Sequence, residues 1–408
     1  SGGERPVAPS SPAATPTVPT AADARGARPR LLIAANVPST LTAFLLPYAR
    51  HYRERGWRVE AAAHGAPDSA EVIAAFDAVH HVPWTRRPTD PVNLTAAART
   101  LRELVRAGAF DLVHVHDPVA SFVTRFALRR ERRRGGVRVV YTAHGFHFFR
   151  GNGALRNLAF RSLERAAAPW TDHLVVINQE DLEAARRLPV AGAVSYLPGI
   201  GVDTGRYDPA AVSDEDVERV RRELGLRAGQ PLLLIVAELN PGKRHRDLVE
   251  ALARADRPDV VVACAGVGPE AAAIEASARE LGLEGRVRLL GYRRDIPALL
   301  RASVGLALPS EREGLPRSVM EAACLERPVL ATRIRGVVEL VRDGETGWLT
   351  EVGDVDALAA AIRELVDDPE RARAMGRAGR VAMRPFDLVE VLRGHDDVYR
   401  TVLGDRFV

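Results

Sequence analysis

The chain contains almost no lysine: of its 57 lysine and arginine residues, Lys243 alone is a lysine and all the others are arginines. Such a bias, together with abundant alanine, is typical of a GC-rich coding sequence. A lysine that persists against this bias is a candidate for a task that arginine performs poorly, such as placing a compact, mobile charge against a phosphate. The competing interpretation is a solitary surface lysine on a turn.

Cysteine and long apolar runs are also scarce. The two cysteines, Cys264 and Cys324, lie in apolar or helical segments, which excludes a disulfide framework and favours a reducing compartment such as the cytoplasm. No apolar run approaches the roughly 20 residues that a membrane-crossing helix needs. No Asp-x-Asp motif follows an expected strand, and no further ligands accompany His116 and Asp117, so we expect no metal site.

Acidic residues are in short supply in the first half of the chain. Residues 1–200 hold 26 arginines against 17 acidic residues, whereas residues 201–408 hold 31 basic against 36 acidic residues. Much of the excess lies in the run Arg125–Arg134, for which a solvated helix end, a nucleic-acid surface and an anionic lipid surface compete. No nucleic-acid-binding motif accompanies this run, so no nucleic-acid partner is expected. Aromatic residues in the same half favour an anionic membrane surface: Phe44, Tyr48, Phe146, Phe148 and Phe149.

What the sequence does contain is a regular alternation of apolar strands and helices, which predicts an α/β fold with a parallel sheet in each half. Residues 1–28 are rich in Ala, Pro, Ser, Thr and Gly without periodicity, and we expect a disordered tail rather than a signal peptide. The expected strands of the first half are 30–36, 58–63, 111–116, 137–142, 173–177 and 194–197. Those of the second half are 232–236, 260–265, 287–290, 304–308 and 329–332.

One loop has the most specific chemical pattern. The apolar run Val304–Pro309 predicts a buried strand, and a helix is expected to open near Pro316. A glycine-bearing loop that leads from the carboxyl end of a strand into a helix N-terminus favours a phosphate. Glu313 and Glu321 bracket this position, and carboxylates accept hydrogen bonds from vicinal hydroxyls. A nucleotide sugar, with its diphosphate between two polyols, would satisfy all of these groups.

The same loop, followed by Arg327–Thr332, Gly336–Val341 and Asp343–Leu349, resembles the donor-binding half of retaining glycosyltransferases of family 4. The resemblance extends from about Arg30 to the C-terminus. It implies the GT-B fold, in which two Rossmann-like domains face each other with parallel sheets across an interdomain cleft. The implied division is a tail at 1–28, an acceptor domain at 29–203, a nucleotide-sugar donor domain at 204–385 and a helix at 386–408 that crosses back to the first domain.

The resemblance also implies roles for individual residues. Lys243 would bind the diphosphate and His144 would approach the reacting ends. Glu321 would hold the ribose hydroxyls and Glu313 those of the donor sugar. Further donor-binding residues are expected in the loop and helix start, in a Gly-x-Gly loop and in the base-binding segment: Gly314, Leu315, Pro316, Arg317, Ser318, Gly266, Gly291, Tyr292 and Arg293. Tyr292 has an equally weighted alternative, which is packing on its own sheet.

The acceptor side of the expected cleft follows from the strand ends. Ligands of open parallel sheets lie outside the carboxyl ends of the strands, which selects Asn36, His116 and Asp117 in the first domain. One position departs from the family pattern, because Glu238 stands where the family usually has an arginine that contacts the diphosphate. Either Lys243 and the helix start suffice there, or another cation supplies the missing charge, the candidates being Arg244, Arg246 and Arg317.

The activity that the resemblance implies is metal-independent transfer of a hexosyl or N-acetylhexosaminyl group, with retention, from a nucleotide-diphosphate sugar to an acceptor hydroxyl. UDP is favoured over GDP or ADP, and no cofactor is expected. The segment Thr171–Asp181 resembles the branch that builds bacterial capsule and exopolysaccharide repeat units. This branch implies a polyprenyl-diphosphate-linked acceptor and a cytoplasmic protein that is peripheral on the inner face of the plasma membrane. Three alternatives stay open: transfer to a diffusible metabolite, a sugar-nucleotide 2-epimerase, and a nucleotide-sugar-binding protein without catalysis, which Glu238 makes conceivable.

Overall fold

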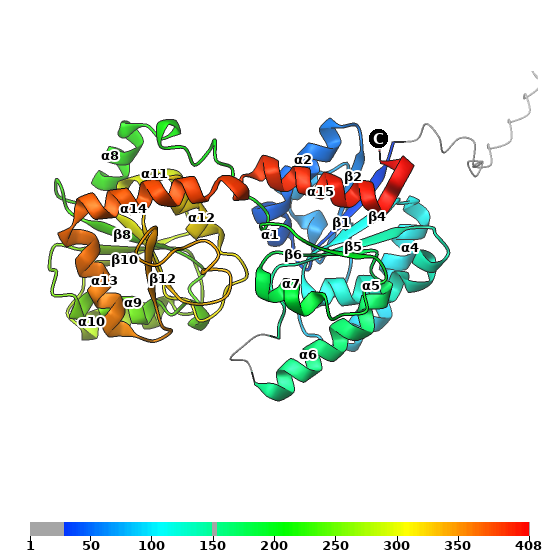
Figure 1. Ribbon diagram of the computed structural model, residues 1–408, viewed down its shortest axis with the longest axis horizontal. Helices are drawn as coiled ribbons and strands as arrows, with labels where there is room; N and C mark the ends of the chain where they lie inside the picture. Colours follow the sequence, from blue (N-terminus) through cyan, green and yellow to red (C-terminus); the bar gives the residue numbers. More distant parts are fainter. Residues whose placement is uncertain (1–27, 149–152, 408) are drawn as a thin grey trace, which may run out of the picture.

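The computed structural model describes residues 28–148 and 153–407 and contains two all-parallel sheets, each packed between helices (Figure 1). The first sheet has seven strands in the spatial order β3 (Ala78–His81), β2 (Arg58–Ala63), β1 (Arg30–Ala34), β4 (Leu112–Val115), β5 (Arg138–Ala143), β6 (His173–Val176) and β7 (Ala193–Tyr196). The second has six strands in the order β10 (Val287–Gly291), β9 (Val261–Ala265), β8 (Leu232–Val236), β11 (Gly305–Leu308), β12 (Val329–Thr332) and β13 (Gly347–Thr350). The α/β class predicted from the alternation of elements is confirmed.

Helices connect most of the successive strands in both halves, the exception being β12 and β13, which are joined by turns. Those of the first half are α1 (Pro38–Thr40), α2 (Leu46–Glu54), α3 (Ala70–Ala75), α4 (Ala98–Gly108), α5 (Pro118–Arg133), α6 (Ala154–Ala167) and α7 (Gln179–Ala185). Those of the second half are α8 (Asp214–Glu223), α9 (His245–Arg254), α10 (Ala271–Glu280), α11 (Ile296–Ala302), α12 (Arg317–Cys324), α13 (Val355–Asp367) and α14 (Pro369–Ala382), followed by α15 (Leu388–Leu403).

Two local features explain where the elements begin and end. Central strands such as β9 are buried along their whole length, which is why their sequences are continuously apolar rather than alternating. The helical stretch after β1 is divided into a π-helical turn, Leu41–Leu45 (η2), and α2. The division falls at Pro47, whose ring nitrogen has no hydrogen to donate to the preceding turn.

The last helix of the chain belongs to the core of the first domain. In Figure 1, α15 (red) runs from the second domain across to the first. Its apolar side chains pack into the same buried cluster as Leu31, Tyr52 and Trp57, and they are Val391, Leu392, Val398, Tyr399 and Leu403. The C-terminal residues are therefore part of the folding unit that begins at β1.

The two connections between the domains cross at one point. The backbone N–H of Val202 donates to the carbonyl of Phe386 (2.9 Å), and the N–H of Leu388 donates to the carbonyl of Val202 (2.9 Å). Both hydrogen bonds join the outgoing chain to the returning one. The chain thus passes from domain to domain twice through a single short parallel bridge.

Tyr399 is the aromatic centre of the α15 contact. Its ring stacks on Tyr52 with centroids 4.9 Å apart and on Trp57 at 5.9 Å, and its hydroxyl lies 2.6 Å from Nδ1 of His114. We predict that Tyr399→Ala lowers the free energy of unfolding by about 3–5 kcal/mol, because it leaves a cavity in the core. It also leaves the buried His114 without one of its partners.

Denaturant-induced unfolding measures this loss. The matched control is Val389→Ala in the same helix, since Val389 is 61% exposed and should change stability by less than about 0.5 kcal/mol. Equal stability of the two variants would contradict the assignment of α15 to the core of the first domain.

Candidate functional site

The carboxyl ends of both sheets border an interdomain cleft of about 830 Å³. The sequence-predicted residues that line it are Asp117 and His144 from the first domain, and Lys243, Gly266, Tyr292, Arg293, Glu313, Gly314, Leu315, Pro316, Arg317, Ser318 and Glu321 from the second. Three predicted residues do not line the cleft, namely Asn36, His116 and Gly291. The cleft therefore brings most of the predicted residues together at the edge where parallel sheets bind ligands.

Lys243 projects from a short turn that follows β8. The side chain of Asn240 accepts a hydrogen bond from the backbone N–H of Lys243 (3.2 Å) and so caps the 3₁₀ turn Pro241–Lys243 (η7). Because β8 and β11 are neighbours in the sheet, this turn lies beside the loop that follows β11. The N–H of Glu311 donates to the carbonyl of Gly242 (2.9 Å) and joins the two segments.

The ammonium group of Lys243 meets one of the two predicted carboxylates. Its Nζ lies 2.6 Å from Oε1 of Glu313, and the two side chains are 24% and 10% exposed. The helix α12 begins a few residues further on. Its N-cap residue is Pro316, which has no polar side chain, so the first-turn N–H groups of Arg317 and Ser318 are uncapped. An ammonium and free amides beside one another form a site suited to a diphosphate.

The other carboxylate, Glu321, is buried at the floor of the cleft. Its Oε1 accepts a hydrogen bond from Nε of Arg317 (2.7 Å), and the hydroxyl of Tyr207 also hydrogen-bonds to it. Burial raises the pKa of Glu321, although Arg317 acts in the opposite direction. Arg317 in addition donates to the carbonyl of Ala43 in the first domain, so this group of residues spans both domains.

The two domains touch where Gly314 meets His144. A Cβ atom on Gly314 would lie 2.0 Å from the carbonyl oxygen of His144, and one on Gly336 would lie 1.9 Å from the carbonyl oxygen of Gly314. No side chain fits at either position. The glycine of the loop thus permits a close backbone approach between the loop that bears the candidate sugar-binding carboxylate, Glu313, and the segment of the other domain that bears His144.

A buried ion pair holds the same interface. Nη1 of Arg335, from the second domain, lies 2.9 Å from Oδ1 of Asp181 in α7, and the two side chains are 7% and 1% exposed. Arg335 also donates to the carbonyl of Phe146 (3.1 Å), and the N–H of Phe146 donates to Asp181 (3.0 Å). These bonds tie the segment that bears His144 to both domains.

The half-buried His144 and three buried histidines extend from the cleft to α15. Nε2 of His144 lies 3.0 Å from Nδ1 of His116, whose ring packs 4.2 Å from that of His114, and His114 in turn lies 5.6 Å from His395. Burial lowers the pKa of His144 and of His395 to about 4, and it lowers the pKa of His114 and His116 well below the usual value. At neutral pH, His144 is an uncharged hydrogen-bonding group.

In the candidate base-binding segment, Tyr292 is exposed in the cleft, whereas Arg293 is held by ion pairs. Tyr292 is 73% exposed and lines the cleft, so it does not pack on its own sheet. Arg293 is bound by two carboxylates, those of Glu223 and of Asp295 (2.7 Å). The N–H of Gly266 donates to the carbonyl of Gly291 (2.8 Å), which fixes the loop between β9 and β10.

On the acceptor side, Asn36 has a structural role. Its side-chain oxygen accepts the N–H of Ala120 (3.0 Å) in the first turn of α5, and its backbone N–H donates to Asp117 (2.6 Å). Asp117 lines the cleft, and burial raises the pKa of its carboxyl group. His116 lies behind His144 and not in the cleft.

Two of the three arginines that were candidates to supply the positive charge missing at Glu238 lie outside the cleft. Arg244 pairs with Asp247 (2.7 Å) and Arg246 is 62% exposed beside Glu270, and neither lines the cleft. The lining instead includes Arg294, which belongs to the candidate base-binding segment, and two residues that the sequence analysis missed, Arg206 and Tyr207. Arg206 and Tyr207 follow the interdomain joint, and no local pattern marked them.

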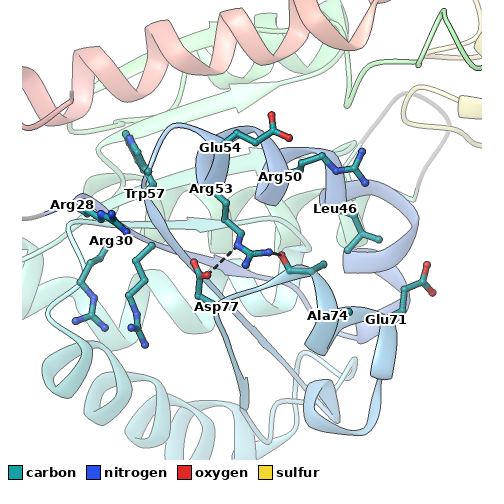
Figure 2. A pocket seen from close by; sticks show the side chains of 13 residues that line it. Arg28, Arg30, Leu46, Arg50, Arg53, Glu54, Trp57, Glu71, Ala74 and Asp77 are labelled. Atoms are coloured by element: carbon teal, nitrogen blue, oxygen red, sulfur yellow. Dashed lines mark hydrogen bonds and ion pairs between the residues drawn. The ribbon is translucent and has the colours of Figure 1, made fainter.

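A larger hollow of about 1110 Å³ lies between α2 and α3 of the first domain (Figure 2). Three of its arginines are engaged: Arg53 binds Asp77 (3.0 Å), and Arg30 and Arg58 both bind the buried Glu60. Arg30 and Arg58 begin β1 and β2, so much of this hollow lies at the amino ends of the strands. That edge is not the one at which parallel sheets bind ligands.

Metal ligands do not gather in the described parts of the chain. Among residues 28–148 and 153–407, no group of three or more His, Cys, Asp or Glu side chains is arranged to hold a metal ion. The two cysteines, Cys264 and Cys324, are both buried and free.

Comparisons with known proteins agree with this geometry. The solved structure of HepE from Anabaena in complex with UDP and glucose superposes with a TM-score of 0.77 at 22% identity, covering 92% of this chain and all (100%) of that one. The fold is therefore GT-B, the two-domain fold of glycosyltransferases.

The sequence comparisons then define the family. The model for "Glycosyltransferase Family 4" matches residues 43–206 and the model for "Glycosyl transferases group 1" matches residues 216–382. A Bacillus subtilis (strain 168) protein named as glycosyltransferase EpsD is 35% identical over 373 residues, which is 91% of this chain and 96% of that protein. An Escherichia coli UDP-Gal:alpha-D-GlcNAc-diphosphoundecaprenol alpha-1,3-galactosyltransferase is 30% identical over 276 residues, 66% of this chain and 70% of that protein. The chain belongs to glycosyltransferase family 4 and is similar to its exopolysaccharide branch.

The buried histidines predict a pH-dependent stability. The pKa of His395 is about 4 in the folded protein and about 6.5 in an unfolded chain. Between these pH values, the unfolded state binds a proton at His395 and the folded state does not. The stability that His395 contributes is fully present above pH 6.5 and falls as the pH drops towards 4. The maximum slope for one histidine is about 1.4 kcal/mol per pH unit.

Denaturant unfolding at several pH values between 7 and 5 measures this slope. The reference is the variant His395→Leu. Buried carboxyl groups such as Glu321, whose pKa is raised, change the stability with pH in the opposite direction. Because they are present in both proteins, the difference between the two slopes reports His395 alone. We expect a shallower slope in the variant. Identical slopes would show that His395 is not held neutral by burial.

Proposed function

We propose that this protein transfers a sugar, with retention of configuration, from a nucleotide-diphosphate sugar to a hydroxyl group of a lipid-linked glycan, without a metal ion or a cofactor. A UDP-sugar is the favoured donor. The observation on which the proposal rests is the convergence of Lys243 and the free amides of α12 between two carboxylates, Glu313 and Glu321, opposite His144.

The arrangement fits the successive parts of such a donor. The diphosphate lies against Lys243 and the start of α12, where it competes with Glu313 for the ammonium group. Glu321, buried next to Arg317 and Tyr207, is placed for the ribose hydroxyls. The exposed ring of Tyr292 is placed to contact the base. Glu313, once released from Lys243, accepts hydrogen bonds from the sugar.

The reaction needs positioning and charge stabilisation rather than an enzymatic nucleophile. The bond between the anomeric carbon and the diphosphate oxygen breaks, and the acceptor oxygen bonds to the same face of the sugar. The leaving diphosphate takes the acceptor proton. Negative charge that develops on it is stabilised by Lys243 and the amides of Arg317 and Ser318. Neutral His144 orients the reacting groups by hydrogen bonding.

The nature of donor and acceptor is supported by relatives. The Anabaena protein was solved with UDP and glucose, and the Escherichia coli enzyme is named for UDP-galactose and a diphosphoundecaprenol-linked acceptor.

The decisive experiment incubates this chain with a panel of nucleotide sugars and a polyprenyl-diphosphate-linked N-acetylhexosamine. NMR of the product gives the anomeric configuration. A UDP-sugar epimer formed without acceptor would establish the 2-epimerase instead, and turnover only with small soluble acceptors would exclude the lipid-linked one.

Lys243 provides the first test of the mechanism. We predict that Lys243→Ala lowers turnover by about 10²–10³-fold, the scale for loss of one preorganised group that stabilises a transition state. The matched control is Arg246→Ala, since Arg246 is a nearby exposed cation outside the cleft. Initial rates at saturating donor measure both variants. Near-normal turnover of Lys243→Ala would remove the ammonium group from the mechanism.

Glu321 provides the second test. Glu321→Gln keeps the size of the side chain and one acceptor oxygen for Arg317, but it removes the charge and one of the two oxygens that would accept the ribose hydroxyls. We expect the KM for the donor to rise by about 10–100-fold with a smaller change in turnover, as for lost hydrogen bonds to a charged group. Calorimetry with UDP measures the same effect without turnover, and unchanged affinity would refute the ribose assignment.

A further inference from the structure

The helix α6 presents large apolar side chains to solvent. Leu155, Leu158 and Leu163 are 84%, 64% and 40% exposed. The helix lies at the lower rim of the first domain in Figure 1, and none of the described helices is long and apolar enough to cross a membrane. A row of exposed leucines on one short helix marks an interaction surface, since single scattered leucines would need no explanation.

The opposite face of α6 fixes the helix to the domain. Phe160 packs against the apolar core, Ala167 is fully buried, and Glu164 pairs with the buried Arg125 (Nη2–Oε2, 2.9 Å). With 3.6 residues per turn, these anchors share one side of the helix. Leu155 and Leu158 lie on the other side, together with the exposed Ala159 and Ala166, and Leu163 lies at the edge of this exposed face.

Charged side chains of α6 flank the exposed leucines on both sides. Arg156 lies on one flank and Arg161 and Arg165 lie on the other, and all three are exposed. Glu164 is the only acidic residue of the helix, and its charge is engaged by Arg125. The outward surface of α6 therefore combines leucines with arginines and has no free carboxylate.

The basic surface continues on the neighbouring helix. Arg132, near the end of α5, donates to the carbonyl of Pro169 just beyond α6 (3.2 Å), so the two helix ends lie together. Arg130, Arg133 and Arg134 of the same end are exposed. Apolar side chains flanked by arginines are the composition of helices that lie in the plane of an anionic membrane surface.

We propose that the face of α6 formed by Leu155, Leu158, Leu163 and the flanking Arg156, Arg161 and Arg165 docks onto an anionic lipid bilayer. The leucines enter the interface between headgroups and acyl chains, while the arginine stems extend along them and place their guanidinium groups among lipid phosphates. A second copy of the chain fits this face poorly, because a twofold contact would set arginines against arginines.

This surface replaces the one expected from the sequence. Of the aromatic residues that favoured lipid binding, Tyr48, Phe146 and Phe148 are buried in the core, and Phe149 lies outside the described residues. Phe44 is 36% exposed but lines the interdomain cleft. The prediction of those three core residues as membrane contacts was therefore wrong.

The position of α6 relates it to the candidate site. Both His144 and α6 lie in the connection between β5 and β6, so a bilayer bound to α6 is adjacent to the domain proposed to receive the acceptor. The docking does not depend on the transfer reaction, and it can be tested without donor or acceptor. Its failure would leave the proposed transferase activity untouched.

The experiment is flotation of the full chain with lipid vesicles. We expect binding to vesicles of phosphatidylglycerol and phosphatidylcholine, weaker binding to phosphatidylcholine alone, and loss of affinity in high salt. The double variant Leu155→Ser/Leu158→Ser should lose at least 10-fold in affinity for the anionic vesicles. The triple variant Arg156→Gln/Arg161→Gln/Arg165→Gln should lose the preference for anionic lipid.

The matched control is Leu281→Ser, a 42% exposed leucine at the end of α10 in the second domain, which should bind vesicles as the parent chain does. Thermal unfolding checks that each variant is folded. Retained binding by both folded α6 variants would overturn the proposal. So would absence of binding by the parent chain at low salt, or a dimer of the parent chain in sedimentation analysis that the leucine variant abolishes.

Discussion

The close approach of Gly314 to the carbonyl oxygen of His144 is the constraint on which the candidate site depends, because it joins the two domains at the point where their ligands would meet. Each half of the site is assembled separately by neighbouring strands: β8 and β11 bring Lys243 to Glu313, and β4 and β5 bring His116 to His144. Neither half alone contains both the candidate phosphate-binding residue, Lys243, and His144. The missing Cβ at position 314 lets the halves close on each other, and a larger residue there would hold the carboxylate of the donor loop away from the other domain.

The strands of both sheets and much of the candidate site could be predicted because they depend on local sequence. Buried parallel strands are continuous apolar runs, so they can be recognised without knowledge of their neighbours. Lys243 stood out because the remaining basic residues are arginines, and the structure sets its ammonium group against Glu313 in the cleft. The parallel sheets then determine which strand ends share an edge, which is why residues far apart in the sequence could be assigned to one cleft.

What could not be predicted depends on contacts between distant segments. The alternation of residues did not reveal α6, since its buried anchors, Phe160 and Glu164, are recognised only through Arg125 and the core of the domain. Asn36 was taken for a cleft residue because it ends a strand, yet its side chain caps α5 through Ala120. The spacing Leu155, Leu158, Leu163, interleaved with arginines, was the signal in the sequence that could have exposed the docking helix. It was overlooked because the run Arg125–Arg134 has more charge, although Arg125 itself is buried.

The parallel bridge at Val202 and Phe386 determines how the two halves of the molecule can move. Because both connecting segments pass through this bridge, it can act as a hinge. A rotation of a few degrees in its backbone would turn one domain relative to the other. In Figure 1 the start of α15 lies at the top of the interface, and α7, which bears Asp181, lies below it. Displacement increases with distance from the bridge, so such a rotation would part Asp181 from Arg335. A rotation of this kind would open the interface on the side remote from α15, while the aromatic contacts of that helix stay intact.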